Sequence, residues 1–167
     1  MLAWTACSVL PEPVPPRLRG VVPVPQYLDS AAAYVITAGP PQPRTDARAF
    51  TVIGDTLYVV EYLRGVHAID NRDPADPRDL AFLDVPGCVS VAARGTYLYV
   101  NNVGDLVTLD VSDPRQARVV DREPGLYPAP LDYPEGHVGE FECYDPARGV
   151  LLGWAEANPA GDLCFLP

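Results

Sequence analysis

The chain has 167 residues, of which 48% are hydrophobic, so it is long enough and apolar enough for one globular domain with its own core. The net charge is −10, every basic residue is an arginine, and no basic run occurs. This balance excludes a protein that binds nucleic acid through its phosphates. No apolar run approaches the roughly 20 residues of a membrane-spanning helix.

Residues 1–7 end in a short apolar stretch before Cys7, which resembles the last part of a bacterial lipoprotein signal, where the cysteine becomes lipidated. The charged beginning and the long apolar centre of such a signal are absent from these residues. Either the true start lies upstream or the likeness arises by chance. The first alternative predicts a cell-envelope protein that reaches the membrane only through a lipid on Cys7. A genuine start at Met1 predicts a cytoplasmic protein.

Residues 8–48 are crowded with proline, which fixes φ and lacks an amide donor. We therefore expect an extended linker with local polyproline character, because neither a helix nor a central strand can run through such a segment. Within it, residues 31–38 contain the strand formers Tyr, Val and Ile and could form one short strand.

Two copies of one pattern follow, the first over 50–87 and the second over 88–125. In each copy, turns that contain glycine and a loop that contains Asp-Pro separate four short runs of β-branched and aromatic residues. The matching positions are Leu57-Tyr58 with Leu98-Tyr99, Asp70 with Asp110, and Asp73-Pro74 with Asp113-Pro114. The expected strands are 50–53, 57–62, 66–70 and 78–85 in the first copy, and 89–93, 97–101, 106–110 and 117–122 in the second. A period of roughly 40 residues with four strands in each unit is typical of propeller blades, so the sequence predicts an all-β, β-propeller-like fold with one blade per copy.

Residues 126–167 are expected to form a loop, a hairpin and a tail of the same domain. The hairpin would join strands at 137–144 and 150–156 through an Asp-Pro-Ala-Arg-Gly turn. Propellers usually close with roughly four to eight blades, so two blades and a hairpin would leave strand edges and apolar faces open. We therefore expect an incomplete propeller whose open edges are covered by a protein partner, by a second copy or by its own N-terminal strand.

The acidic residues of the two repeat loops suit a structural role. Asp70 and Asp110 end the third strand of each copy, where their carboxylates can accept backbone amides of the following loop, as Asx turns do. A ring of such carboxylates could instead bind a cation, but their spacing matches no known calcium loop, so we assign no metal and no cofactor. The residues given this structural role are Asp70, Asp73, Pro74, Asp110, Asp113 and Pro114.

The two histidines carry no catalytic pattern. His67 lies inside an expected strand and could line a propeller channel, although a packed residue is the commoner case. His137 lies beside Glu135 and Glu140, and two histidines with acids could bind a metal only if the fold brought them together. No G-x-S-x-G turn accompanies any serine, so we assign no nucleophile.

The cysteines lack the C-x-x-C spacing of a zinc or redox site. Cys143 and Cys164 bracket the expected hairpin and tail. In an exported protein they could form a disulfide, and in a cytosolic protein they would stay reduced and buried. Cys88 follows a glycine at a strand start and is expected to pack as a small hydrophobic residue.

The repeat cores at 66–70 and 106–110 resemble the LVIVD repeat of bacterial envelope proteins, and the segment FECYDPARGVLLGWAE resembles the hairpin that follows those repeats. The likeness covers about residues 50–156. It implies a β-propeller-like protein, often a lipoprotein, without an assigned enzymatic activity. Members of that family generally carry further repeats after the hairpin, and this chain does not.

These features favour a non-enzymatic, exported repeat module that serves as an interaction scaffold. Propeller faces commonly bind partners through the loops between strands, which here would be 71–77, 111–116 and 125–137. One alternative is part of a propeller enzyme whose site on the axis would use His67, Asp70 or Asp110 and would need missing blades. A second alternative is a truncated gene product.

Overall fold

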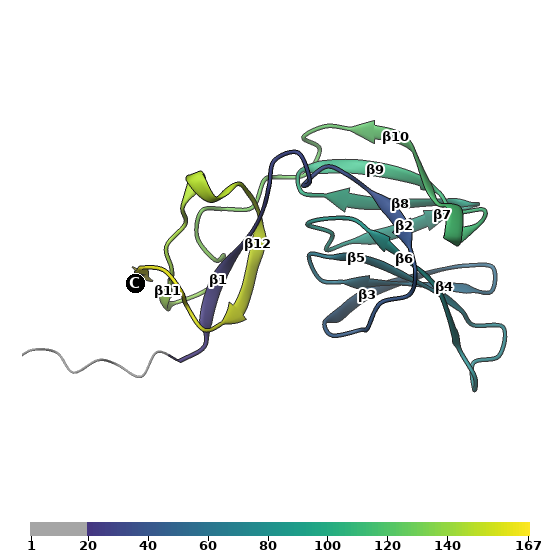
Figure 1. Cartoon of the computed structure of the whole chain (residues 1–167), viewed down its shortest axis with the longest axis horizontal. Helices are drawn as coiled ribbons and strands as arrows, with labels where there is room; N and C mark the ends of the chain where they lie inside the picture. Colours follow the sequence, from purple (N-terminus) through teal and green to yellow (C-terminus); the bar gives the residue numbers. More distant parts are fainter. Residues whose placement is uncertain (1–19) are drawn as a thin grey trace, which may run out of the picture.

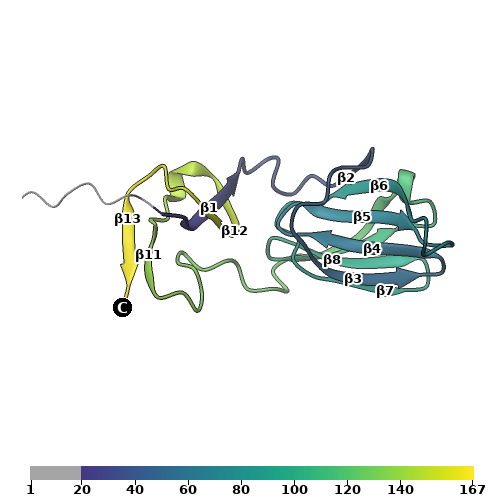
Figure 2. The same ribbon diagram turned by 90° about the horizontal axis from the view of Figure 1, so that it is seen from below.

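The computed structural model describes residues 20–167, which form an all-β protein of two lobes (Figure 1). The larger lobe holds two stacked antiparallel sheets, and the smaller lobe combines strands from both ends of the described chain (Figures 1 and 2). Residues 1–19 are not described, so Cys7 and the expected lipoprotein signal at 1–7 lie outside the described residues. Among the residues described, no helix is long and apolar enough to cross a membrane.

Each segment with the shared pattern forms one sheet of the larger lobe. The first sheet has the order β2-β6-β5-β4-β3, and the second has the order β10-β9-β8-β7. Within each sheet the four strands of the pattern pair with their chain neighbours, as the alternation of strands and turns predicts. The strands of the first sheet are β2 (Thr37–Gly39), β3 (Ala47–Ile53), β4 (Thr56–Glu61), β5 (Gly65–Asp70) and β6 (Arg78–Asp84). Those of the second sheet are β7 (Val91–Arg94), β8 (Tyr97–Asn102), β9 (Asp105–Asp110) and β10 (Arg118–Glu123).

The core lies between the two sheets, because alternate residues of each strand point to opposite faces. Tyr58 and Val60 of β4 point inward and meet Leu98 and Val100 of β8, and all four side chains are buried. The hydroxyl of Tyr58 also reaches the carbonyl of Val111 across the interface, at 3.5 Å. The contact between the sheets is therefore made chiefly of β-branched and leucine side chains.

The smaller lobe contains two two-stranded sheets. β1 (Val22–Leu28) pairs with β12 (Val150–Ala157), and β11 (Gly139–Glu142) pairs with β13 (Leu163–Leu166). Two short 3₁₀ helices, η1 (Pro114–Gln116) and η2 (Pro146–Arg148), follow the Asp-Pro turns of the larger and smaller lobes. The expected hairpin of 137–144 with 150–156 is thus wrong, because its two strands pair with other partners.

The physical reason for this rearrangement is close approach by β1. Gly149 opens β12 with φ 119°, and a Cβ there would lie 2.4 Å from the carbonyl oxygen of Leu28. Only glycine lets the backbone of β1 come so near. β1 then forms the backbone hydrogen bonds with β12 that the expected hairpin partner would have formed. A disulfide between Cys143 and Cys164 joins the end of β11 to β13.

The expected linker over 8–48 is also corrected within its described part, which contains β1 and β2. Pro23 and Pro25 are tolerated in β1 because it is the edge strand of a two-stranded sheet. On the free side of such a strand, a missing amide removes no hydrogen bond to another strand. Residues 40–46 then cross the outer face of the first sheet from β6 to β3. Arg44 pairs with Asp79 of β6, and the amide of Thr45 bonds Glu61 of β4. The N-terminal part of the described chain thereby covers one face of the stack.

Candidate functional site

An open cleft of about 870 Å³ lies between the two lobes. The larger lobe contributes the β4–β5 and β8–β9 turns together with Arg48 and Tyr62. The smaller lobe contributes residues 152–156 of β12, and the connecting loop 127–137 forms a third wall. A cleft of this size between lobes is the usual form of a small-ligand or peptide site.

Two turn residues of the larger lobe line the cleft with an unusual backbone. Leu63 has φ 61° and Val103 has φ 54°, and both side chains are buried. Bulky residues in this left-handed region cost roughly 1–2 kcal/mol each. The amide of Leu63 donates to the carbonyl of Cys88 at 2.8 Å, and its carbonyl accepts the amide of Gly87 at 2.9 Å, so the neighbouring loop fixes the turn. A Cβ on Gly153 of β12 would lie 2.9 Å from the Leu63 side chain, so this turn is where the lobes touch.

The loop 127–137 is fixed to both lobes. Its first amide, on Tyr127, donates to the carbonyl of Gly104 in the β8–β9 turn at 2.9 Å. In the smaller lobe, the indole N–H of Trp154 donates to the carbonyl of Leu131 at 3.1 Å. Phe141 packs edge-on against the Trp154 ring, with centroids 5.6 Å apart. A proline-containing segment is therefore held by a backbone hydrogen bond to the larger lobe and by an indole hydrogen bond from the smaller lobe.

The opposite wall carries a flat, charged platform. The guanidinium of Arg48 lies 3.9 Å from the centroid of the Tyr62 ring, and its Nε donates to Asp46 at 2.8 Å. This hydrogen bond is the main reason that the pKa of Asp46 falls below its ordinary value. An arginine stacked on an aromatic ring presents both an apolar surface and free donors to a ligand.

Buried polar residues hold this wall in place, and the sequence pattern does not predict them. Glu61 is 1% exposed, and its carboxylate accepts the amides of Thr45 at 2.8 Å and Asp46 at 2.7 Å. It also accepts the Thr45 hydroxyl, and it lies 3.1 Å from Nε2 of His67. Burial would raise the pKa of Glu61, but the bonds from Thr45, Asp46 and His67 outweigh it and lower the pKa to about 2.

Asn101 makes a similar arrangement in the second sheet. Its side-chain oxygen accepts the amides of Val89 and Ser90 at 2.8 and 2.9 Å, and its amide group donates to Gly87 at 2.8 Å. Glu61 therefore anchors the segment that enters β3, and Asn101 anchors the segment that enters β7. The one sequence signal for Glu61 and Asn101 is that each is a polar residue at the end of an otherwise apolar strand.

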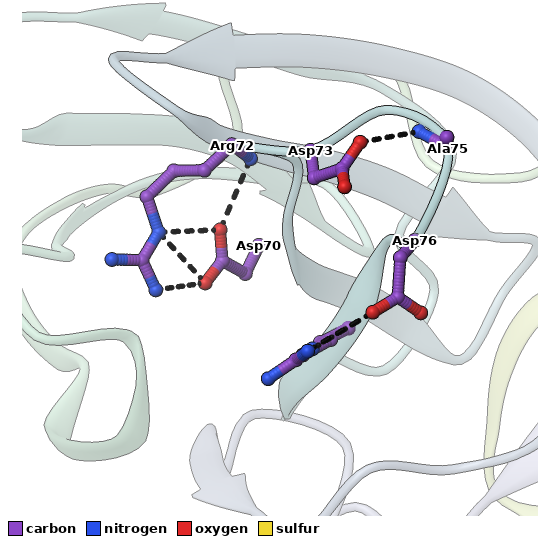
Figure 3. Close-up of polar contacts among 6 residues, drawn as sticks. Asp70, Arg72, Asp73, Ala75 and Asp76 are labelled. Carbon is purple, nitrogen blue, oxygen red and sulfur yellow. Dashed lines mark hydrogen bonds and ion pairs between the residues drawn. The ribbon is translucent and has the colours of Figure 1, made fainter.

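The predicted loop residues follow β5 and β9, at the opposite end of the larger lobe from the turns that line the cleft. Figure 3 shows the polar contacts of the first of these loops. Asp70 accepts the amide of Arg72 at 3.1 Å and pairs with its guanidinium, which is the main cause that lowers the pKa of Asp70 to about 2. Asp73 accepts the amide of Ala75 at 3.0 Å. Asp76 pairs with Arg78 at 3.0 Å. These carboxylates thus bind the backbone and arginines of their own loop.

The second loop has the same construction. Asp110 accepts the hydroxyl and the amide of Ser112, at 2.6 and 3.0 Å, and pairs with Arg118 at 2.7 Å. The Ser112 hydroxyl is the main reason that the pKa of Asp110 is lowered. Asp113 caps η1 through the amide of Arg115 at 3.0 Å, and Pro114 takes the first position of that helix. Pro74 lies between Asp73 and its partner amide in the first loop.

The loops of both sheets meet in a groove of about 580 Å³, lined by Asp55, Asp70, Asp79, Arg72, Arg78 and Arg115 among others. Within residues 20–167, no group of three or more His, Cys, Asp and Glu side chains is placed to hold a metal ion. His67 is buried beside Glu61, whereas His137 lines the cleft and contacts the carbonyl of Glu140 at 3.0 Å. Cys88 is a buried thiol, and burial raises its pKa to about 12.

Comparison with protein-family models, with curated proteins and with solved structures finds no match to this chain.

Proposed function

We propose that this chain is an exported, non-enzymatic binding module of propeller-like architecture, which holds an extended segment of a partner protein in the cleft between its lobes. The observation that carries this proposal is the hydrogen bond from Trp154 to the proline-containing loop 127–137. Aromatic grooves recognise proline-rich segments in this manner, because such segments are extended in advance and keep their carbonyls free. The loop already lies on one wall, and the partner segment would lie beside it, against Tyr62 and Arg48.

The wider parts of the proposal rest on three further features. The two repeats each supply four consecutive strands to a sheet of their own, and they follow one another in the chain as successive propeller blades do. The disulfide between Cys143 and Cys164 suits an oxidising compartment outside the cytoplasm. The residues before Cys7 resemble a lipoprotein signal, which suits attachment to the cell envelope.

A display library of linear twelve-residue peptides tests the binding function. We expect clones that bind the protein, bind at least tenfold more weakly to Tyr62→Ala, and bind unchanged to Phe165→Ala. Phe165 is the control because it is 66% exposed and does not line the cleft. Bound peptide should also change the fluorescence of Trp154, and this change should vanish in Trp154→Phe. A library without binders, or binders whose affinity Tyr62→Ala leaves unchanged, would refute the proposed function.

A further inference from the structure

The two sheets are built from one repeat. The outer face of each sheet is therefore equivalent to the face with which the other sheet packs inside the molecule. In the first sheet, Leu57 pairs with Ile69 one position after the pair of Thr56 with Asp70. In the second sheet, Leu98 pairs with Leu109 one position after the pair of Tyr97 with Asp110. The Leu98–Leu109 pair is buried against the first sheet, whereas Leu57 and Ile69 point away from the core. Equivalent strand pairs of the two sheets therefore point in the same direction along the stack.

The outer face of the first sheet keeps its apolar character where it is open. Phe50 and Val52 of β3 are 71% and 52% exposed, and they pair with the half-buried Val59 and Leu57 of β4. The corresponding pairs in the second sheet, Val91 with Val100 and Ala93 with Leu98, pack into the core. We name the four outward residues Phe50, Val52, Leu57 and Val59 the front face. It has the composition of a surface that receives another sheet.

The outer face of the second sheet is equivalent to the inner face of the first sheet, which packs against the second sheet. Tyr58 of the first sheet points inward, and its hydroxyl reaches the carbonyl of Val111 in the second. The matching residue is Tyr99, which pairs with Thr108 just as Tyr58 pairs with Ala68. Tyr99 points outward, beside Ala92 and the 44% exposed Tyr97. We name the surface of Ala92, Tyr97 and Tyr99 the rear face.

Two features confine any contact to these strands. On the first sheet, residues 40–46 cover the β5–β6 half of the outer face, so that His67 and Phe82 are buried there. On the second sheet, the β9–β10 half is polar, because Thr108 and Asp121 stand where the first sheet has Ala68 and Ala81. The covered half and the polar half occupy corresponding positions. Both leave β3–β4 of one molecule and β7–β8 of another free to pack.

We infer that the front face binds the rear face of a second copy of this chain, so that molecules associate head to tail. The interaction extends the internal sheet-on-sheet contact in the same direction, with Tyr99 of one copy directed at the carbonyl of Asn71 in the next. Asn71 is the counterpart of Val111, since their amides donate to Asp55 and Thr96, respectively, just before β4 and β8. Such a contact is heterologous and closes into a ring when the rotation between copies allows it. Only two strands from each sheet take part, so the dissociation constant should be roughly micromolar or weaker.

Sedimentation equilibrium from about 1 to 500 μM tests the inference. We expect the mass to rise with concentration above the 18.0 kDa of one chain. Phe50→Arg blocks the front face, Tyr99→Arg blocks the rear face, and each variant alone should stay monomeric. An equimolar mixture should form a dimer, because each variant supplies the face that the other lacks. Val138→Arg, on a residue of the smaller lobe that is 72% exposed, is the matched control and should associate as the unaltered protein does.

Three results would overturn the inference. The first is an unaltered protein that remains monomeric across this range. The second is self-association that only one of the two variants abolishes, since that indicates like faces in contact. The third is two folded variants, each monomeric, that form no dimer when mixed; Tyr97→Arg replaces Tyr99→Arg if the latter fails to fold. The inference does not use the cleft, so Tyr62→Ala should associate normally whatever its peptide binding.

Discussion

We expect Glu61→Ala to lower the free energy of unfolding by about 3 kcal/mol at pH 7. The substitution leaves the amides of Thr45 and Asp46 and the ring of His67 without the carboxylate they contact. Hydrogen bonds to a charged acceptor contribute about 1.5–3 kcal/mol each, but Thr45 and Asp46 are otherwise exposed, so water can replace part of the loss. His67 is 1% exposed and has no such replacement.

The pKa of Glu61 gives a second route to the same magnitude. Its value falls from 4.5 to about 2 in the folded protein, and each pH unit of difference corresponds to about 1.4 kcal/mol. Because the folded pKa is depressed, the stabilisation is fully present above pH 4.5 and is lost as the pH falls toward 2. At pH 3, less than half of the roughly 3 kcal/mol should remain.

Urea unfolding at pH 7 and pH 3 measures both quantities. The comparison uses the unaltered protein, Glu61→Ala, and Glu123→Ala as a control on an exposed carboxylate of β10. The difference between the unaltered protein and Glu61→Ala isolates the contribution of Glu61 from those of the other acidic residues. An equal midpoint for Glu61→Ala and Glu123→Ala at pH 7 would refute the anchoring role. So would a difference that stays the same at pH 3.

Three further outcomes are expected. Reduction of the disulfide between Cys143 and Cys164, which are 21 residues apart, should destabilise the smaller lobe by about 3 kcal/mol. Hydrogen exchange should then become faster in β13 and stay unchanged in β4. An equal acceleration in both strands would contradict this. Cys88, whose pKa is raised to about 12 by burial, should resist iodoacetamide at pH 8 until urea unfolds the protein, as mass spectrometry would report. Gly65→Ala should prevent stable folding, because its Cβ would lie 2.1 Å from a backbone oxygen of β6. The Cβ of Gly54→Ala meets no atom within 4 Å, so this variant should lose only about 1–2 kcal/mol of unfolding free energy. Thermal unfolding of the two variants measures the difference.

The strands of the larger lobe could be predicted because their partners are close in the chain. Gly54 and Gly95 adopt positive φ in the turns before β4 and β8, and such turns bring successive strands together. The expected strand at 57–62 lies one residue from the observed β4, Thr56–Glu61. The smaller lobe could not be predicted in this way. β12 pairs with β1 from the other end of the chain, and no local pattern encodes a partner so distant.

The cleft was also hidden from the sequence, although its loop was not. The loop 125–137 was expected to contact partners, and much of it forms one wall of the cleft. Leu63 and Trp154 come from different lobes, and their proximity depends on the contact of Leu63 with Gly153. The other loops expected to bind partners, 71–77 and 111–116, lie near the groove at the far end. Their carboxylates contact backbone amides and arginines, which gives them a structural task.

The smaller lobe reuses the local design of the first sheet, and this explains why a proline-rich segment becomes a strand. Glu142 ends β11 and is 1% exposed, and its carboxylate accepts the amide of Ala160 before β13, as Glu61 does with the segment before β3. An Arg-Gly-Val sequence begins the next strand in both places, at 64–66 and 148–150. Gly65 admits the backbone of β6 and Gly149 admits that of β1, so β1 occupies the place that β6 holds in the first sheet. The strand that follows β12, β13, pairs with β11, so β1 fills the edge of β12, and this edge position is one that Pro23 and Pro25 can accept.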